Sequence, residues 1–165
     1  MGIAEISTIK SYLTFKIGDE EYGAHVNKVQ SILGLQEITK VPKSPDYMKG
    51  VINLREMVLP IIDTRVKFDM TPTEFTDNTS IIVIELGVND KTVNIGALVD
   101  SVVAVREIDE KIIQPSPRIG NNYKFEFISG VVKLEENFIM ILDLVKLFTS
   151  DEFNKLKKIQ TEKSE

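Results

Sequence analysis

The stretch that decides the fold is "GVINLREMVLPIIDTRVKF", residues 50–68, because the chain nearly repeats it 80 positions later as "GVVKLEENFIMILDLVKLF", residues 130–148. The two segments align without a gap and are identical at seven of 19 positions. An earlier pair, "YGAHVNKVQSI" (22–32) and "IGALVDSVVAV" (95–105), matches at an offset of 73. Two matched pairs in the same order indicate an internal duplication. The alternative is that buried β-hairpins merely share a general pattern.

Short β-strands are the elements that the alternation of apolar and polar residues predicts in the first copy. The expected elements are strands at 11–18, 21–26 and 26–35 (the last with room for a helical turn), a short helix capped by Ser44 with Pro45 at its first position, a hairpin across Arg55–Met57, and a short helix capped by Asp63. Serine and aspartate are favoured caps, and proline is favoured at the first helical position.

The second copy is predicted to repeat this order. Its expected elements are strands at 79–86, 92–97, 98–105, 126–134 and 138–142 and a helix at 143–149, with a turn-rich link at 71–79 and a long polar connection at 108–123. Many short strands separated by turns are typical of an all-β sandwich or barrel. Two copies therefore predict an all-β fold of two small five-stranded barrels, with short helices.

The two barrels are expected to meet along an apolar seam, because each is too small to be very stable alone. A barrel of about five strands fills its interior with side chains. We expect residues 1–165 to form a single domain made of two barrel subdomains. Its charged C-terminal tail, residues 151–165, is amphipathic at the start and should be helical there before it frays.

Composition excludes several classes of function. The chain is 42% hydrophobic and 27% charged, as in ordinary globular proteins. It has no cysteine, which excludes disulfides, thiol catalysis and cysteine-ligated zinc. Its net charge of −5 disfavours nucleic-acid binding. No apolar run approaches the roughly 18 residues of a membrane span, and neither a secretory signal nor a myristoylation motif is present. We expect a cytoplasmic protein with no cofactor and no metal.

Asp63 and Asp143 are the most enzyme-like pair, because the repeat places them at equivalent positions after apolar strands. Two equivalent carboxylates on duplicated β units could share a proton, as in aspartic proteases. Neither aspartate has the neighbouring glycine of such sites, since the two sites read Asp-Thr-Arg and Asp-Leu-Val. Helix caps are the favoured interpretation, with a duplicated-barrel hydrolase as the unlikely alternative.

Surface positions offer a second kind of site. Arg55 lies in the turn of the first hairpin, where the second copy has Glu135. Arginine suits protein interfaces because its planar fork pairs with carboxylates, but an ordinary exposed turn arginine explains it equally well. Val29, Val102 and Val105 fit either a core or an apolar groove between the barrels. The single histidine, His25, has no catalytic partner motif and is interpreted as solvated or half-buried.

Four segments together resemble the CheW family of bacterial chemotaxis coupling proteins. They are "FKIGDEEYGAHVNKVQSI", "PDYMKGVINLREMVLPIIDTRVKF", "IGALVDSVVAV" and "FISGVVKLEENFIMILDLVKLF", in the order of the family, and the resemblance covers about residues 10–150. It implies two small OB- or SH3-like β-barrels with exchanged strands.

The resemblance also implies function and partners. CheW proteins are non-catalytic adaptors that bridge the cytoplasmic tip of chemoreceptors, the methyl-accepting chemotaxis proteins, to the regulatory domain of the histidine kinase CheA. The implied location is therefore the cytoplasm, in association with membrane receptor arrays and without insertion into the membrane. An adaptor of another sensory kinase pathway is an alternative that the sequence does not separate.

Site residues follow from the resemblance by motif. The implied receptor-facing groove contains Val29, Gly50, Asn53, Arg55, Val102 and Val105. The implied kinase-facing surface contains Val26, Ile32 and Leu59. Gly50 would allow a receptor helix to approach closely, and Arg55 would be the polar anchor. The chain departs from the family in two places, with Glu56 where glycine is usual and Ser31 where many members have glutamate.

Overall fold

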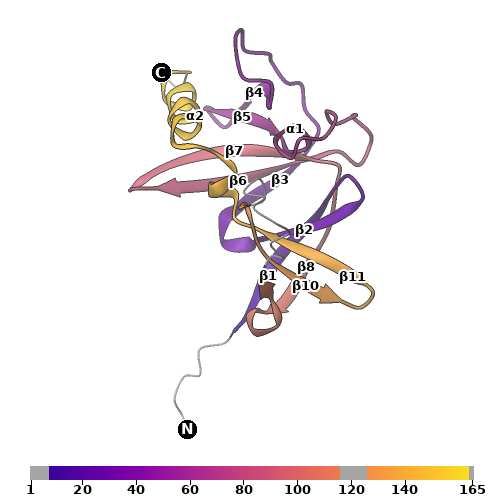
Figure 1. Cartoon of the computed structure of the whole chain (residues 1–165). Coiled ribbons are helices and arrows are strands. Elements are labelled where there is room, and N and C mark those ends of the chain that lie inside the picture. Colours follow the sequence, from indigo (N-terminus) through magenta and orange to yellow (C-terminus); the bar gives the residue numbers. More distant parts are fainter. Residues whose placement is uncertain (1–7, 116–125, 164–165) are drawn as a thin grey trace.

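The computed structural model describes residues 8–115 and 126–163, with side chains as far as Gln160 in the last helix (Figure 1). Its elements in chain order are β1 (Ile9–Ile17), β2 (Glu20–His25), the 3-10 helix η1 (Val26–Lys28), β3 (Val29–Gly34), β4 (Met48–Leu54), β5 (Met57–Asp63), α1 (Thr64–Lys67), β6 (Ser80–Val88), β7 (Lys91–Val99), β8 (Ser101–Asp109), the 3-10 helix η2 (Glu110–Ile112), β9 (Gln114–Pro115), β10 (Ile128–Leu134), β11 (Asn137–Leu142), the 3-10 helix η4 (Leu144–Leu147) and α2 (Ser150–Lys163).

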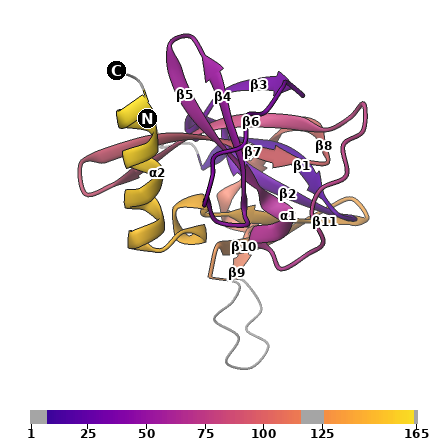
Figure 2. The same cartoon turned by 90° about the horizontal axis from the view of Figure 1, so that it is seen from above.

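The strands form two sheets, which lie one above the other in Figure 1 and are seen from above in Figure 2. The six-stranded sheet has the order β8-β1-β2-β11-β10-β9, and the five-stranded sheet has the order β3-β6-β7-β5-β4. The copies exchange strands, because β1 and β2 pair with strands of the second copy while β6 and β7 pair with strands of the first. Neither sheet is therefore built from a contiguous half of the chain.

The register of the parallel strand pairs shows the repeat in three dimensions. In the five-stranded sheet, Ile61 of β5 lies opposite Gly96 of β7. In the six-stranded sheet, Ile141 of β11 lies opposite Gly23 of β2. Ile141 follows Ile61 by 80 positions and Gly96 follows Gly23 by 73, which are the offsets of the sequence repeat. The same local arrangement is thus built twice, at the offsets of the sequence repeat.

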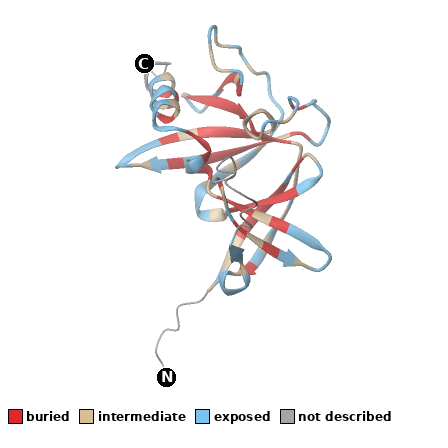
Figure 3. Cartoon of the chain, in the orientation of Figure 1, coloured by how far each residue is buried: buried red, intermediate tan, exposed pale blue. Residues whose placement is uncertain are grey.

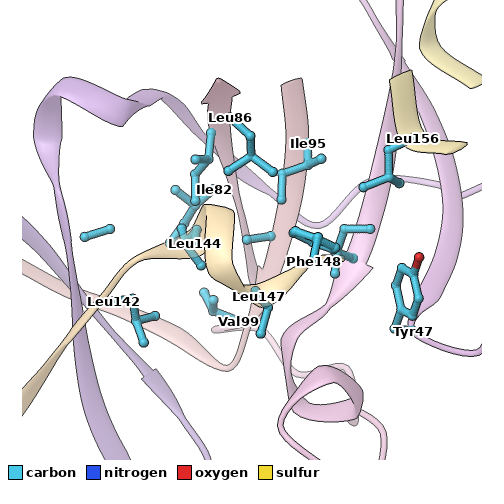
Figure 4. Packing of buried hydrophobic residues seen from close by; sticks show 14 of the residues in the cluster. Tyr47, Ile82, Leu86, Ile95, Val99, Leu142, Leu144, Leu147, Phe148 and Leu156 are labelled. Carbon is cyan, nitrogen blue, oxygen red and sulfur yellow. The ribbon is translucent and has the colours of Figure 1, made fainter. Parts of the chain in front are cut away.

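Buried apolar side chains form three clusters. The largest lies between the sheets and joins Phe15 of β1 to Ile84 of β6. Figure 4 shows Leu144 and Phe148, from the end of the second copy, packed in this cluster. A smaller cluster around Leu59 fills the other face of the five-stranded sheet, and one around Ile139 fills that of the six-stranded sheet. Burial accordingly concentrates in the middle of both sheets (Figure 3).

The helix α2 covers the five-stranded sheet at β5 and β7 (Figure 1). Phe153 and Leu156 are buried in the central cluster. The Gln160 side chain accepts from the Asn94 N–H at 3.1 Å and donates to the Asn94 and Val58 carbonyls at 3.0 and 3.2 Å. One glutamine therefore satisfies backbone groups of two strands, and buried backbone groups need such partners.

Some expectations need correction. The helix predicted at Ser44 and Pro45 is absent, because this segment makes turns and Tyr47 is drawn into a backbone bond, its carbonyl accepting from the Asp63 N–H at 2.7 Å. The helix predicted at 143–149 is a 3-10 helix. Part of the polar connection predicted at 108–123 lies outside the described residues.

The expected pair of five-stranded barrels is met in part. The structure is mostly β, with one sheet of five strands and one of six. Among the described residues, the first and last strands in each sheet's order are not paired with each other. No described helix is long and apolar enough to cross a membrane.

Candidate functional site

The strands β3 and β8 occupy equivalent positions at one edge of each sheet. Each pairs with a single strand, β3 with β6 and β8 with β1. Each also carries a one-residue bulge, at Gln30 of β3 and at Val103 of β8, which are 73 positions apart. A bulge inserts an extra residue, so side chains three positions apart in the bulged strand face the same side of the sheet.

Each bulge brings one pair of apolar residues onto the inner face of its sheet. Val29 and Ile32 share that face of β3, and Val102 and Val105 share it on β8. Their paired residues on the neighbouring strands are Ile84, Ile82, Phe15 and Leu13, respectively, all members of the central core cluster. We call the set of Val29, Ile32, Val102 and Val105 the edge-strand surface. This surface adjoins the core between the sheets on one side and reaches solvent on the other.

Exposure rises along the edge-strand surface. Val29 and Val102 are partly buried against the core. Ile32 is 47% exposed and Val105 is 62% exposed. Both strands lie on the side of the molecule away from α2 (Figures 1 and 2). Apolar side chains gathered at a surface mark sites of protein interaction more often than single exposed ones do.

Asn53 and Arg55 lie elsewhere, on the β4–β5 hairpin. In strand order this hairpin is at the opposite end of the five-stranded sheet from β3. Both side chains are exposed, and Arg55 has a positive φ of 50° in the hairpin turn. Among the described residues the Arg55 guanidinium makes no ion pair, so Glu56 does not occupy it. The guanidinium is available to a partner.

Two residues that the resemblance assigned to partners are buried. Leu59 has 0% exposure and lies at the centre of its own core cluster. Gly50 is also buried, and a Cβ at this position would collide with the Thr39 carbonyl of the same chain. The close approach that requires this glycine is thus made by the chain itself, where Thr39 and Val51 form an isolated bridge.

The structure places the other two residues of the expected kinase-facing surface, Val26 and Ile32, near the expected receptor-facing residues. Val26 is half-buried in η1 and packs against the central cluster. Ile32, expected on the kinase side, lies on the same face of β3 as Val29. The sequence carries a signal for this grouping, because the offset of 73 aligns Ile32 with Val105. The exposed Val103 was missed because a bulge is not visible in the alternation of residue types.

Asp63 and Asp143 do not form a catalytic pair. Asp63 has 0% exposure, and its carboxylate accepts from the Arg65 N–H at 3.1 Å, the Thr73 N–H at 3.0 Å and the Thr73 hydroxyl at 2.7 Å. The predicted cap is therefore confirmed for Asp63. Asp143 occupies the capping position of η4, but its side chain makes no capping bond.

Comparison with known proteins agrees with these observations. The family model of the CheW-like domain matches residues 11–152. The chain is 34% identical over 157 residues to the chemotaxis protein CheW of Klebsiella aerogenes, covering 92% of each protein. It is 37% identical over 143 residues to the probable chemotaxis protein CheW of Rhizobium etli, covering 87% of this chain and 90% of the relative.

A solved structure has the same fold. The scaffolding protein TtCheW of Thermoanaerobacter tengcongensis superposes with a TM-score of 0.75 at 29% identity, over 87% of this chain and 94% of the other. Coverage of this extent includes both copies of the repeat. The chain therefore belongs to the CheW family of non-catalytic chemotaxis scaffolding and coupling proteins.

Proposed function

We propose that this protein couples the cytoplasmic tips of chemoreceptors to the regulatory domain of the histidine kinase CheA, in receptor arrays on the cytoplasmic side of the membrane. The observation that carries the proposal is the edge-strand surface, which exposes apolar side chains from both sheets on one side of the molecule. An adaptor needs such surfaces and no catalytic group. Its interfaces should be modest in area, because signalling assemblies form and rearrange reversibly.

The receptor is proposed to bind the edge-strand surface as a helical hairpin. Exposed Val105 and half-buried Val102 and Val29 offer the apolar contacts that a helix in a groove requires. Arg55 and Asn53 are proposed as polar contacts on the β4–β5 hairpin. Gly50 contributes indirectly in this proposal, by holding the segment around Thr39 against β4.

The kinase is proposed to bind at the Ile32 part of this surface and at the adjoining Val26, while the receptor occupies the part formed by Val29, Val102 and Val105. Leu59 has no exposed area and supports β3 from the other face of the sheet, where its cluster includes Leu33. We further infer that each sheet curls into a small barrel, because a single cluster collects side chains from Leu33 of β3 to Leu98 of β7, and that residues 1–165 work as one domain.

Reversal of charge at Arg55 tests the receptor contact. Arg55→Glu should abolish receptor-dependent kinase activation in a reconstituted array while leaving the unfolding transition unchanged, because the side chain is exposed and makes no ion pair with the described residues. The measurement is kinase autophosphorylation with receptor, kinase and the variant. Glu135→Arg, a charge reversal in the equivalent turn of the second copy, is the matched control and should retain coupling. Equal loss in both variants contradicts the assignment.

A titration locates the whole surface. A receptor tip hairpin added to isotope-labelled protein should shift the amide NMR signals of Val29, Val102, Val105 and Arg55 as one group. Shifts confined to α2, or scattered over both sheets, contradict the proposed surface.

A further inference from the structure

A cavity of about 300 Å³ opens where β6, η1 and η4 meet. Its walls are mainly apolar, with Ile84 of β6, Leu144 of η4 and Tyr12 of β1. They also contain His25 and the charged Lys28 and Glu85. Asp143 also lines it, and this carboxylate makes no hydrogen bond or ion pair with the residues that the structure describes. The cavity lies beside the edge-strand surface but shares no residue with it.

The internal repeat shows what normally fills such a place. Asp63 is the equivalent of Asp143, and there the chain itself supplies the partner. After α1 the link runs back over Asp63, and Thr73 donates both its backbone N–H (3.0 Å) and its hydroxyl (2.7 Å) to the carboxylate. Both residues are buried, Asp63 at 0% and Thr73 at 6% exposure. The first copy is therefore closed by an extended threonine-containing segment.

Within residues 8–115 and 126–163, the second copy has no such closing segment. After η4 the chain enters α2 directly, which packs on β5 and β7 of the other sheet. Phe153, the residue 80 positions after Thr73, is buried there in the central core. Asp143 is consequently left with a cavity where Asp63 has a partner.

Two further side-chain contacts near Asp63 in the first copy have no equivalent near Asp143 in the second copy. The Thr64 hydroxyl donates to the Leu98 carbonyl at 2.6 Å, but its equivalent Leu144 has no hydroxyl. Arg65 pairs with Asp100 at 2.9 Å, but its equivalent is Val145. The surroundings of Asp143 are thus more open and more apolar than those of Asp63.

We propose that the cavity at Asp143 is a docking site for an extended segment of a partner protein that carries a threonine or serine, bound as Thr73 is bound to Asp63. Complementarity of a negative charge with hydrogen-bond donors supports this occupant, because a carboxylate in a mainly apolar cavity favours donors and a hydroxyl residue supplies two, its backbone N–H and its O–H, as Thr73 does at Asp63. Apolar side chains flanking the hydroxyl residue occupy the walls. The site adds a third binding surface to the two proposed above and does not depend on them.

The test uses the full chain and a synthetic peptide copied from its own link, Asp69–Thr76, acetylated and amidated. In an NMR titration, the peptide should shift the amides of His25, Asp143 and Leu144 in a saturable manner. Asp143→Ala should weaken binding about ten-fold, as expected for the loss of charge-assisted hydrogen bonds. A peptide with Thr73→Val should lose a similar factor. Asp151→Ala, an equal change of charge at an exposed position of α2, should bind as the unchanged protein does.

Several outcomes overturn the proposal. The proposal is wrong if the peptide causes no saturable shifts. It is also wrong if the shifts centre on Asp63 and Arg65, because the peptide would then only displace the native link. Shifts at Asp143 that appear on concentrating the protein alone would assign the cavity to a second copy. Binding seen only after removal of residues 1–7 would assign it to the chain itself. Unchanged affinity with Asp143→Ala would remove the carboxylate from the site.

Discussion

Gly50 and Gly130 show at the residue scale why the two copies kept the same amino acid. Each sits at a bulge in its strand, and each is crossed by a neighbouring segment of the chain. A Cβ on Gly50 would meet the Thr39 carbonyl, and a Cβ on Gly130 would lie 2.9 Å from the Gln114 carbonyl. Gly50 also has a φ of 152°, which side chains rarely permit. The lack of a side chain at these glycines lets a neighbouring segment pack directly against β4 and against β10.

Substitution of these glycines should therefore destabilise the fold. Gly50→Ala and Gly130→Ala should each lower the free energy of unfolding by about 2 kcal/mol, because the added methyl group must displace backbone. Urea unfolding followed by circular dichroism measures the change. Gly34→Ala is the control, since nothing lies within 4 Å of a Cβ at that position. Equal stability of all three variants would contradict the close backbone contacts at Gly50 and Gly130.

Glu56 adopts a backbone conformation that suits glycine. Its φ is 69°, in the turn between β4 and β5, whereas Glu136 at the equivalent turn position is not among the residues with positive φ. A non-glycine residue in this region costs on the order of 1 kcal/mol. Glu56→Gly should raise the free energy of unfolding by about 0.5 kcal/mol, after the added flexibility of the unfolded chain is subtracted. Glu136→Gly should lower it, and a gain in both variants would contradict this reasoning.

At the scale of elements, α2 is tied to α1 by an ion pair. The Lys67 ammonium lies 2.9 Å from both Glu152 oxygens and 4.3 Å from the centre of the Tyr47 ring. Burial raises the pKa of Tyr47 to about 12, with a smaller contribution from the Glu152 charge. Burial also raises the pKa of Glu152, but the hydrogen bonds from Lys67 and Thr149 outweigh it and hold this pKa below its ordinary value.

The lowered pKa of Glu152 predicts a dependence of stability on pH. A carboxyl whose pKa is depressed by folding stabilises the protein above its unfolded pKa of 4.5, and this contribution is lost as pH falls through the folded value. Glu152→Gln should therefore be less stable than the unchanged protein at pH 7, and the difference should shrink below about pH 4.5. Thermal unfolding across this pH range measures it. Glu136→Gln, at an exposed turn, should show no such convergence.

At the scale of the whole molecule, the exchange of strands makes the two halves depend on each other. β2 finds its parallel partner β11 in the second half, and β5 finds its partner β7 there. The central core cluster also joins both halves. Neither half carries a complete sheet or a complete core, so the protein should unfold in one cooperative step.

Separated halves test this dependence. Fragments 1–75 and 76–165 should each be largely unfolded alone, with poorly dispersed NMR spectra, because their strands lack partners and their apolar faces are exposed. Mixed in equal amounts, they should regain the spectrum of the intact chain. A well-dispersed spectrum from either fragment alone would contradict the interdependence of the halves.

Much of the fold could be predicted from the sequence because its signals are local. Alternation located the strands, and the turn across Arg55 and Glu56 was found where expected. The cap at Asp63 was also found, whereas the short helix at Ser44 was not, since a backbone bond to β5 overrode the local preference. The candidate site was predicted less well, because Gly50 and Leu59 proved to be buried.

The amino-acid sequence by itself determined the duplication, the number and type of most elements, and the family, since all of these rest on residue identity and spacing. Only the tertiary structure decided which sheet each strand joins and which side chains the bulges at Gln30 and Val103 direct toward the core. It also decided that Thr73 covers Asp63 while Asp143 lines a cavity. The physical reason is that pairing joins segments far apart in the chain, such as Glu21 and Ile139. Such pairing is selected by the packing of the whole molecule rather than by the local pattern.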